Sequence, residues 1–217
     1  MIVDKSQLEV GVAEMPPAME FQWRRPQTFF PLAMAATTSP RAFFAAMPHQ
    51  GGWWPPLAFL LVAQAIPALV LAGFQIPQHG LAALAGMMVF LAKRLVYSLA
   101  FAGLIWLMAR FAGRAKIDFH STLRIFCYSS GVWIVSAAVP ILSLAPAALV
   151  MVLLVLCHLY LIQAGLQVVA NLPTFQAILS VLLAIVAFML LWVILAPMLG
   201  LMPPPSASPP APPPGQP

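Results

Sequence analysis

Hydrophobic residues of this 217-residue chain gather into long stretches. A helix of about twenty apolar residues, rising 1.5 Å per residue, crosses a hydrocarbon layer roughly 30 Å thick. The stretches of that length lie at residues 56–76, 81–109, 121–144, 147–170 and 175–199. We therefore predict an all-α fold, a polytopic integral membrane bundle of about five transmembrane helices.

Charged side chains are too few to cover a water-soluble protein. Lys, Arg, Asp and Glu make up 7% of the residues, against roughly a quarter in an ordinary soluble domain. The net charge of +5 could suggest a nucleic-acid partner. The basic residues lie beside the hydrophobic stretches, however, where the bias of positive charge towards the cytoplasmic side explains them. We expect no nucleic-acid partner.

The local composition divides the chain into four parts. The first twenty residues hold four of the five acidic side chains and lack the basic start and apolar core of a signal peptide. The segment after them alternates aromatic pairs with prolines and arginines, as interfacial segments do. The expected parts are a mobile cytoplasmic tail at 1–20, an interfacial amphipathic segment at 21–54, the transmembrane bundle at 55–200 and a disordered proline-rich tail at 201–217.

A short helix is predicted within the interfacial segment, at SPRAFFAAMP. Ser39 can cap its first amides, Pro40 suits the first helical position and Pro48 ends the helix. Phe43 and Phe44 would supply an apolar anchor.

The second hydrophobic stretch is interrupted by Lys93 and Arg94. If its cytoplasmic end is Arg110, Arg94 lies roughly 24 Å away along a helix, close to the opposite interface. Both side chains can then extend to the headgroups. Residues 81–92 would form an interfacial extension, and a sixth crossing is the less favoured alternative.

Basic residues beside the spans set the orientation, because positive charge is retained on the cytoplasmic side. With the N-terminus inside, eight basic residues are cytoplasmic and two face outwards. The eight are Lys5, Arg24, Arg25, Arg41, Arg110, Arg114, Lys116 and Arg124. Five crossings then place the C-terminus on the opposite side. Sparse charge and abundant alanine and proline fit a bacterial inner membrane.

Three features of the chain stand together. They are the paired phenylalanines of PRAFFAAMP, the basic junction ARFAGRAKIDFHSTLRIFCYSSG with its Thr-Leu-Arg start to the third span, and a proline-broken third span followed by two closely spaced helices. Together they resemble the Yip family of membrane proteins, whose eukaryotic members are named for interaction with Ypt/Rab GTPases. The resemblance covers residues 27–199 and implies a five-helix bundle. Eukaryotic members carry an Asp-Leu-Tyr-Gly-Pro type motif without a counterpart here, which argues against a GTPase partner.

Two sets of residues are candidates for a functional site. Arg110, Arg114, Lys116 and Arg124 lie in the junction before the third span and could bind anionic lipid headgroups or a partner, or could simply set the orientation. Polar residues of the fourth span recur on one helical face. They are Tyr160, Gln163, Gln167 and Asn171. This stripe could form hydrogen bonds between helices or line a path for a polar solute or lipid.

No pattern indicates catalysis or a cofactor. The sequence has no Walker loop, no G-x-S-x-G and no H-E-x-x-H. His158 is the one histidine deep in a span, and a structural hydrogen bond is the favoured reading. The other histidines fall on both faces and cannot converge on a metal. Cys127 and Cys157 lie in apolar spans and indicate no disulfide framework.

Two functions are therefore open. The first is a non-enzymatic membrane organiser or scaffold for lipids, a membrane-protein partner or a second copy of the chain, acting through the basic cytoplasmic face. The alternative is a small transporter or channel component for a polar solute or lipid, using the stripe on the fourth span.

Overall fold

The computed structural model describes residues 20–48 and 51–198. The tails expected at 1–20 and 201–217 lie outside this part, apart from Glu20. The described residues form seven α-helices and two 3₁₀ helices, and they contain no strand. The predicted all-α fold is confirmed for them.

Five of the helices are long and apolar enough to cross a membrane, as predicted. The third of them begins as an α-helix and continues as a 3₁₀ helix. Their bounds are α3 (Trp54–His79), α4 (Ala82–Phe111), α5 (Phe119–Ser129) with η3 (Ser130–Ile141), α6 (Leu144–Val169) and α7 (Thr174–Met198).

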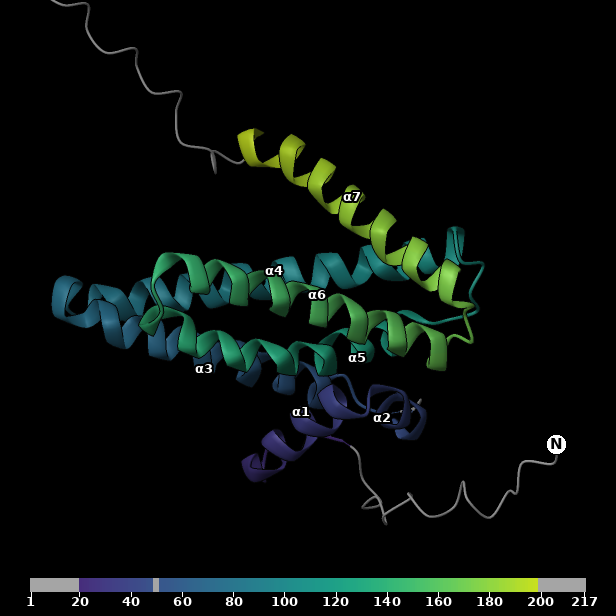
Figure 1. The fold of residues 1–217 in the computed structure, drawn as a ribbon, viewed down its shortest axis with the longest axis horizontal. Helices are drawn as coiled ribbons and strands as arrows, with labels where there is room; N and C mark the ends of the chain where they lie inside the picture. Colours follow the sequence, from purple (N-terminus) through teal and green to yellow (C-terminus); the bar gives the residue numbers. More distant parts are fainter. Residues whose placement is uncertain (1–19, 49–50, 199–217) are drawn as a thin grey trace, which may run out of the picture.

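The helices α3, α4, α6 and the joined pair α5–η3 run side by side along the long axis of the molecule (Figure 1). The turns between consecutive spans are short, which makes neighbouring helices antiparallel. The last helix, α7, packs against α4 and α6 near its start and then diverges from them (Figure 1). The bundle is thus compact on the α3 side and open beside α7.

Before the first span, the chain forms a short 3₁₀ helix and two short α-helices instead of one. These are η2 (Pro26–Thr28), α1 (Phe29–Thr38) and α2 (Pro40–Ala46). Pro40 occupies the start of α2 as predicted, but Ser39 makes no side-chain capping bond. Phe43 and Phe44 are fully buried against the bundle, so they anchor the helix to protein. The two helices therefore belong to the packed core.

The second span is a single helix of 30 residues. Residues 82–92 continue it without a turn, so the described chain has no sixth crossing. At 1.5 Å per residue α4 is roughly 45 Å long, which exceeds the hydrocarbon thickness. Lys93 is exposed, whereas Arg94 turns inward and its guanidinium lies over the ring of Trp133. The expected extension of both side chains to the headgroups is thus not found for Arg94.

The third span changes its helix type in mid-course. The 3₁₀ part, η3, is 12 residues long, although 3₁₀ runs of more than three or four residues are uncommon. Ser129, the last residue of α5, and Ser130, the first of η3, bond back to the carbonyls of Ile125 and Phe126. Such bonds compete with regular helix bonding and bend helices.

Gly165 lets α6 approach α5 closely. A Cβ atom at this position would overlap the side chain of Ile125, which is completely buried. The absence of a side chain at Gly165 is therefore a condition of this helix contact.

Gly165→Ala should lower the melting temperature of the purified protein, because overpacking a close contact costs roughly 1–3 kcal/mol. Thermal unfolding in detergent, followed by circular dichroism, measures this. Gly73→Ala is the matched control, since a methyl group there meets no atom within 4 Å and alanine favours helix. Equal melting temperatures for Gly165→Ala and wild type would contradict the close contact.

Candidate functional site

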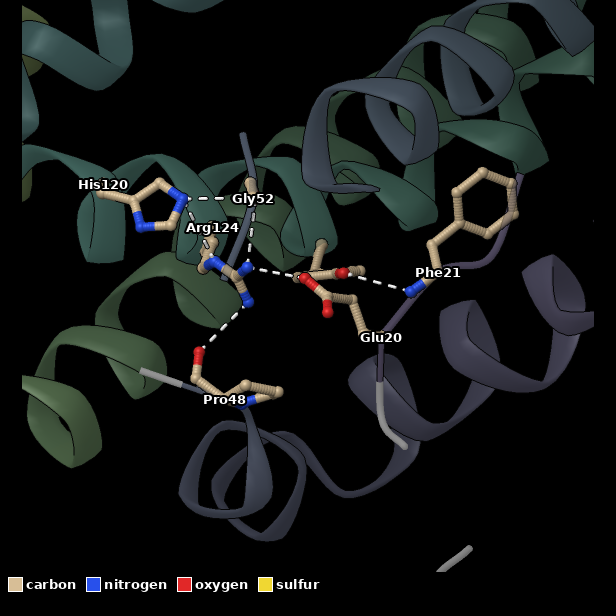
Figure 2. A network of polar contacts seen from close by, with 7 residues as sticks. Glu20, Phe21, Pro48, Gly52, His120 and Arg124 are labelled. Carbon is tan, nitrogen blue, oxygen red and sulfur yellow. Dashed lines mark hydrogen bonds and ion pairs between the residues drawn. The ribbon is translucent and has the colours of Figure 1, made fainter. Parts of the chain in front are cut away.

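A buried arginine joins the third span to the segment before the first. Arg124 lies in the second turn of α5, and its side chain has no solvent exposure. Its Nη2 donates to Oε1 of Glu20 at 2.6 Å and to the carbonyl oxygen of Gly52 at 3.2 Å. Its Nη1 donates to the carbonyl oxygen of Pro48 at 3.1 Å. Figure 2 shows the guanidinium surrounded by these acceptors.

The chemistry of the guanidinium suits this position. Arginine carries five N–H donors in a fixed plane and stays charged, so one side chain can bind several acceptors. A buried charge is tolerated when it is paired and hydrogen-bonded. The backbone also comes close, because a Cβ atom at Gly51 would overlap the guanidinium. Arg124 thus fixes two segments that lie about 70 and 100 residues earlier in the chain.

His120 lies one helical turn before Arg124, and its Nε2 has two neighbours. Nε of Arg124 is 3.4 Å away and the carbonyl oxygen of Gly52 is 3.3 Å away. The arginine can only donate and the carbonyl can only accept, so Nε2 can satisfy one of them at a time. Neutral His120 with its proton on Nδ1 accepts from Arg124, and a protonated Nε2 donates to Gly52.

Tyr128 extends the same attachment by one more turn of α5. Its hydroxyl oxygen accepts a hydrogen bond from the backbone N–H of Phe21 at 3.2 Å. Its ring packs against Phe43 of α2 and Phe59 of α3, with centroid distances of 5.5 and 5.0 Å. The face of α5 that carries Arg124 and Tyr128 therefore holds the chain before the membrane in place.

Asp118 caps the start of α5. Its carboxylate accepts a hydrogen bond from the backbone N–H of Ser121 at 3.2 Å. Partial burial acts to raise the pKa of Asp118, but the hydrogen bonds from Ser121 and the nearby charge of His120 outweigh it and hold the pKa below its usual value. The cap is thus a carboxylate at neutral pH, which suits the positive end of the helix.

The other three residues of the predicted basic cluster lie on the surface. Arg110, Arg114 and Lys116 are exposed. In the extended segment before α5, buried Ala115 and Ile117 alternate with exposed charged residues, so the basic side chains face outwards. We call Arg110, Arg114 and Lys116 the basic loop. The structure separates Arg124 from it, because Arg124 is buried and paired with Glu20.

The polar stripe on the fourth span is only partly as expected. Tyr160 is exposed, and Asn171 lies beyond the end of α6 in left-handed conformation. Gln167 accepts a hydrogen bond from Nη2 of Arg41 on α2 at 3.3 Å. It thus bonds to a neighbouring helix, as the first reading of the stripe expected. None of the four stripe residues lines the cavities of about 370, 170 and 200 Å³ between the helices.

His158 is buried and hydrogen-bonded, as the sequence predicted. Its Nδ1 lies 3.1 Å from the carbonyl oxygen of Ser129, at the point where α5 passes into η3. A carbonyl only accepts, so Nδ1 is the donor and Nε2 is left for another partner. In the part of the chain that the structure describes, no group of three histidine, cysteine or acidic side chains could hold a metal ion.

Sequence reasoning missed the partners of Arg124. Glu20 was assigned to a mobile tail, and the carbonyls of Pro48 and Gly52 carry no sequence signal of their own. One signal was available. An arginine at the start of an apolar helix needs an acceptor, and Glu20 is the acidic residue nearest to the first span.

Comparison with known proteins returned one finding. The family model described as the Yip1 domain matches residues 34–195, which is more than half of the chain. No curated protein and no solved structure matches the chain. The matched range contains α2, the first four spans, α7 up to residue 195 and Arg124, whereas Glu20 lies before it.

Glu20→Gln should loosen the segment before the first span, because it leaves the buried guanidinium of Arg124 without its counter-charge. Removing one partner of a buried ion pair costs roughly 3–5 kcal/mol, and the partial exposure of Glu20 places the loss at the lower end. Hydrogen exchange of the amides in α1 and α2 should rise several-fold. The control Arg110→Gln, at an exposed position, should leave that exchange as it is in wild type. Unchanged exchange in Glu20→Gln would refute the role of the pair.

Proposed function

Because this chain belongs to the Yip1 domain family, we propose that it is a non-enzymatic membrane organiser whose basic loop binds anionic lipid headgroups at the cytoplasmic surface. The chain is an integral membrane protein with five candidate spans. We add to this the surface through which the protein acts and the chemical class of ligand that this surface recognises. The basic loop is the observation that carries it.

Three exposed cations project from one short connection between two spans. Arg110 lies in the last turn of α4, and its guanidinium is over the ring of Trp106, 5.4 Å from the ring centre. The indole N–H of Trp106 donates to the carbonyl oxygen of Ile117, 3.2 Å away. These contacts hold both ends of the basic loop, so the backbone that carries its three cations is fixed against the bundle. Each basic residue beside an anionic membrane contributes about 1 kcal/mol of attraction.

The orientation belongs to the same proposal. With the basic loop in the cytoplasm, the N-terminus is also cytoplasmic and the C-terminus is on the far side. Eight of ten basic residues are then cytoplasmic, in keeping with the positive-inside bias. A bacterial inner membrane, rich in anionic lipid on its cytoplasmic face, is the membrane we infer.

The segment fastened by Arg124 supports a scaffold role for protein partners as well. The attachment holds α1 and α2 beside the basic loop's end of the bundle, where they contact α5 and α6. Exposed side chains on these helices, among them Phe30 and Met34 of α1, face away from the core. We infer that a membrane-protein partner or a second copy of the chain docks beside this end. The transport reading has less support, because the stripe on α6 lines none of the three cavities described above.

Neutralising the basic loop with Arg110→Gln, Arg114→Gln and Lys116→Gln together should reduce retention of phosphatidylglycerol on the purified protein. Native mass spectrometry after extraction from mixed phosphatidylglycerol and phosphatidylcholine membranes measures the retained lipid. Three cations at about 1 kcal/mol each make a loss of roughly a hundredfold at low salt, and high salt should reduce the difference.

Lys93→Gln is the control, because it removes an exposed cation from the interior of α4 instead of from the loop. Labelling of a cysteine placed near the N-terminus checks that the orientation is unchanged. Equal phosphatidylglycerol retention by wild type and the triple variant, at equal orientation, would contradict the proposed lipid role of the basic loop.

A further inference from the structure

Arg94 lies in the interior of a span, where a lone charge is costly. It is roughly 18 Å from the first residue of α4 and roughly 26 Å from the last, measured along the helix. Its guanidinium carbon is 4.8 Å from the centre of the Trp133 ring. The only salt bridge within the described residues is that of Arg124 with Glu20, and no hydrogen bond there involves Arg94. An intramembrane cation of this kind is expected to have an anionic partner.

A cavity of about 370 Å³ lies beside Arg94, between α3, α4, α6, α7 and the joined pair α5–η3. Further polar side chains line it, namely Gln64, Tyr97, Ser98 and His158. Gln64 is 94% buried, and within the described residues its amide has no hydrogen-bond partner. One part of the cavity wall thus offers a cation and an amide that lack partners of their own.

The remaining wall is apolar and reaches the outside of the bundle. It includes Phe101, Phe126, Ile185 and Phe188, which come from α4, α5 and α7. Met189 also lines the cavity, although 62% of it is exposed on the outer face of α7. On one side the cavity is walled by residues of α7, the helix that diverges from the bundle after its start (Figure 1). Its opening therefore faces the surroundings of the helices, which are hydrocarbon.

A second cavity, of about 170 Å³, meets the first at the same residues. Gln64, Arg94 and Trp133 line both of them. The second cavity adds the hydroxyl-bearing Ser136 on η3. Arg94 and Gln64 thus lie where the two cavities adjoin, with apolar walls on the α7 side.

We propose that the cavity binds an anionic amphiphile from the membrane. The phosphate or carboxylate of the ligand accepts hydrogen bonds from Arg94 and Gln64, and its acyl chain lies along the apolar wall towards α7. Arginine suits this task, because its planar donors match both oxyanions. The volume is within the range of ligand pockets, roughly 300–1,000 Å³. A water-soluble anion would leave the apolar wall without a partner.

The binding test uses the full chain in detergent, in the background where Arg110, Arg114 and Lys116 are replaced by Gln. Surface binding by the basic loop is then removed, so the outcome is independent of the function proposed above. Native mass spectrometry titrations use phosphatidylglycerol, oleate, phosphatidylcholine and inorganic phosphate as separate probes. We expect binding of phosphatidylglycerol or oleate, which identifies the ligand as a phospholipid or a fatty acid. Arg94→Leu should lower that affinity at least tenfold.

Lys93→Leu is the matched control, because it removes the adjacent exposed cation and should change the affinity less than twofold. Equal affinity in Arg94→Leu and its background, or equal loss in Lys93→Leu, would overturn the proposal. Equally tight binding of phosphatidylcholine or of inorganic phosphate alone would also overturn it, since the first is not anionic overall and the second has no acyl chain.

A second measurement covers the case in which Arg94→Leu does not fold. A photoreactive fatty acid, with a diazirine on its acyl chain, is crosslinked to the protein of native sequence. Peptide mass spectrometry should locate adducts on Phe188 or Met189 of α7, and excess oleate should suppress them. Adducts spread over the outer faces of the helices, without suppression by oleate, would contradict a specific site.

Discussion

Hydrocarbon offers no hydrogen bonds to the backbone, and this constraint determines the architecture of the chain. Each spanning segment must bond its amides and carbonyls internally, which long helices do. The outer faces of these helices carry exposed apolar residues at helical spacing, such as Leu149, Val152, Leu153 and Leu156 on α6. In water this surface would be unstable. In a bilayer it is the ordinary boundary between protein and lipid.

Two arginines inside this apolar frame are accommodated in different ways. Arg124 is satisfied by the chain itself, through Glu20 and the carbonyls of Pro48 and Gly52. These bonds hold the segment before the first span against the bundle, where it packs as part of the core. Arg94 has an aromatic face and a cavity beside it. Arg124 thus organises the fold at one end of the bundle, whereas Arg94 lies beside a cavity for which we propose a ligand.

The parts that could be predicted from the sequence are those set by local length and composition. The spans were predictable because a stretch of twenty apolar residues has few alternatives in a membrane protein. The bond of His158 followed from the cost of burying a polar ring. The pairing of Glu20 with Arg124 could not be predicted, because the two residues are 104 positions apart. The direction of Arg94 depends on how α4 is rotated against η3, and packing decides that rotation.

The central claim is that hydrocarbon surrounds the outer faces of the five helices. Spin labels at Leu153 on α6 and Val186 on α7, in a background with Cys127 and Cys157 replaced, test it in reconstituted vesicles. Both positions are more than half exposed. We expect these two labels to collide often with oxygen and rarely with a water-soluble nickel chelate, and we expect the reverse for a label at Lys116. Ready access of the nickel chelate to Leu153 and Val186 would contradict it.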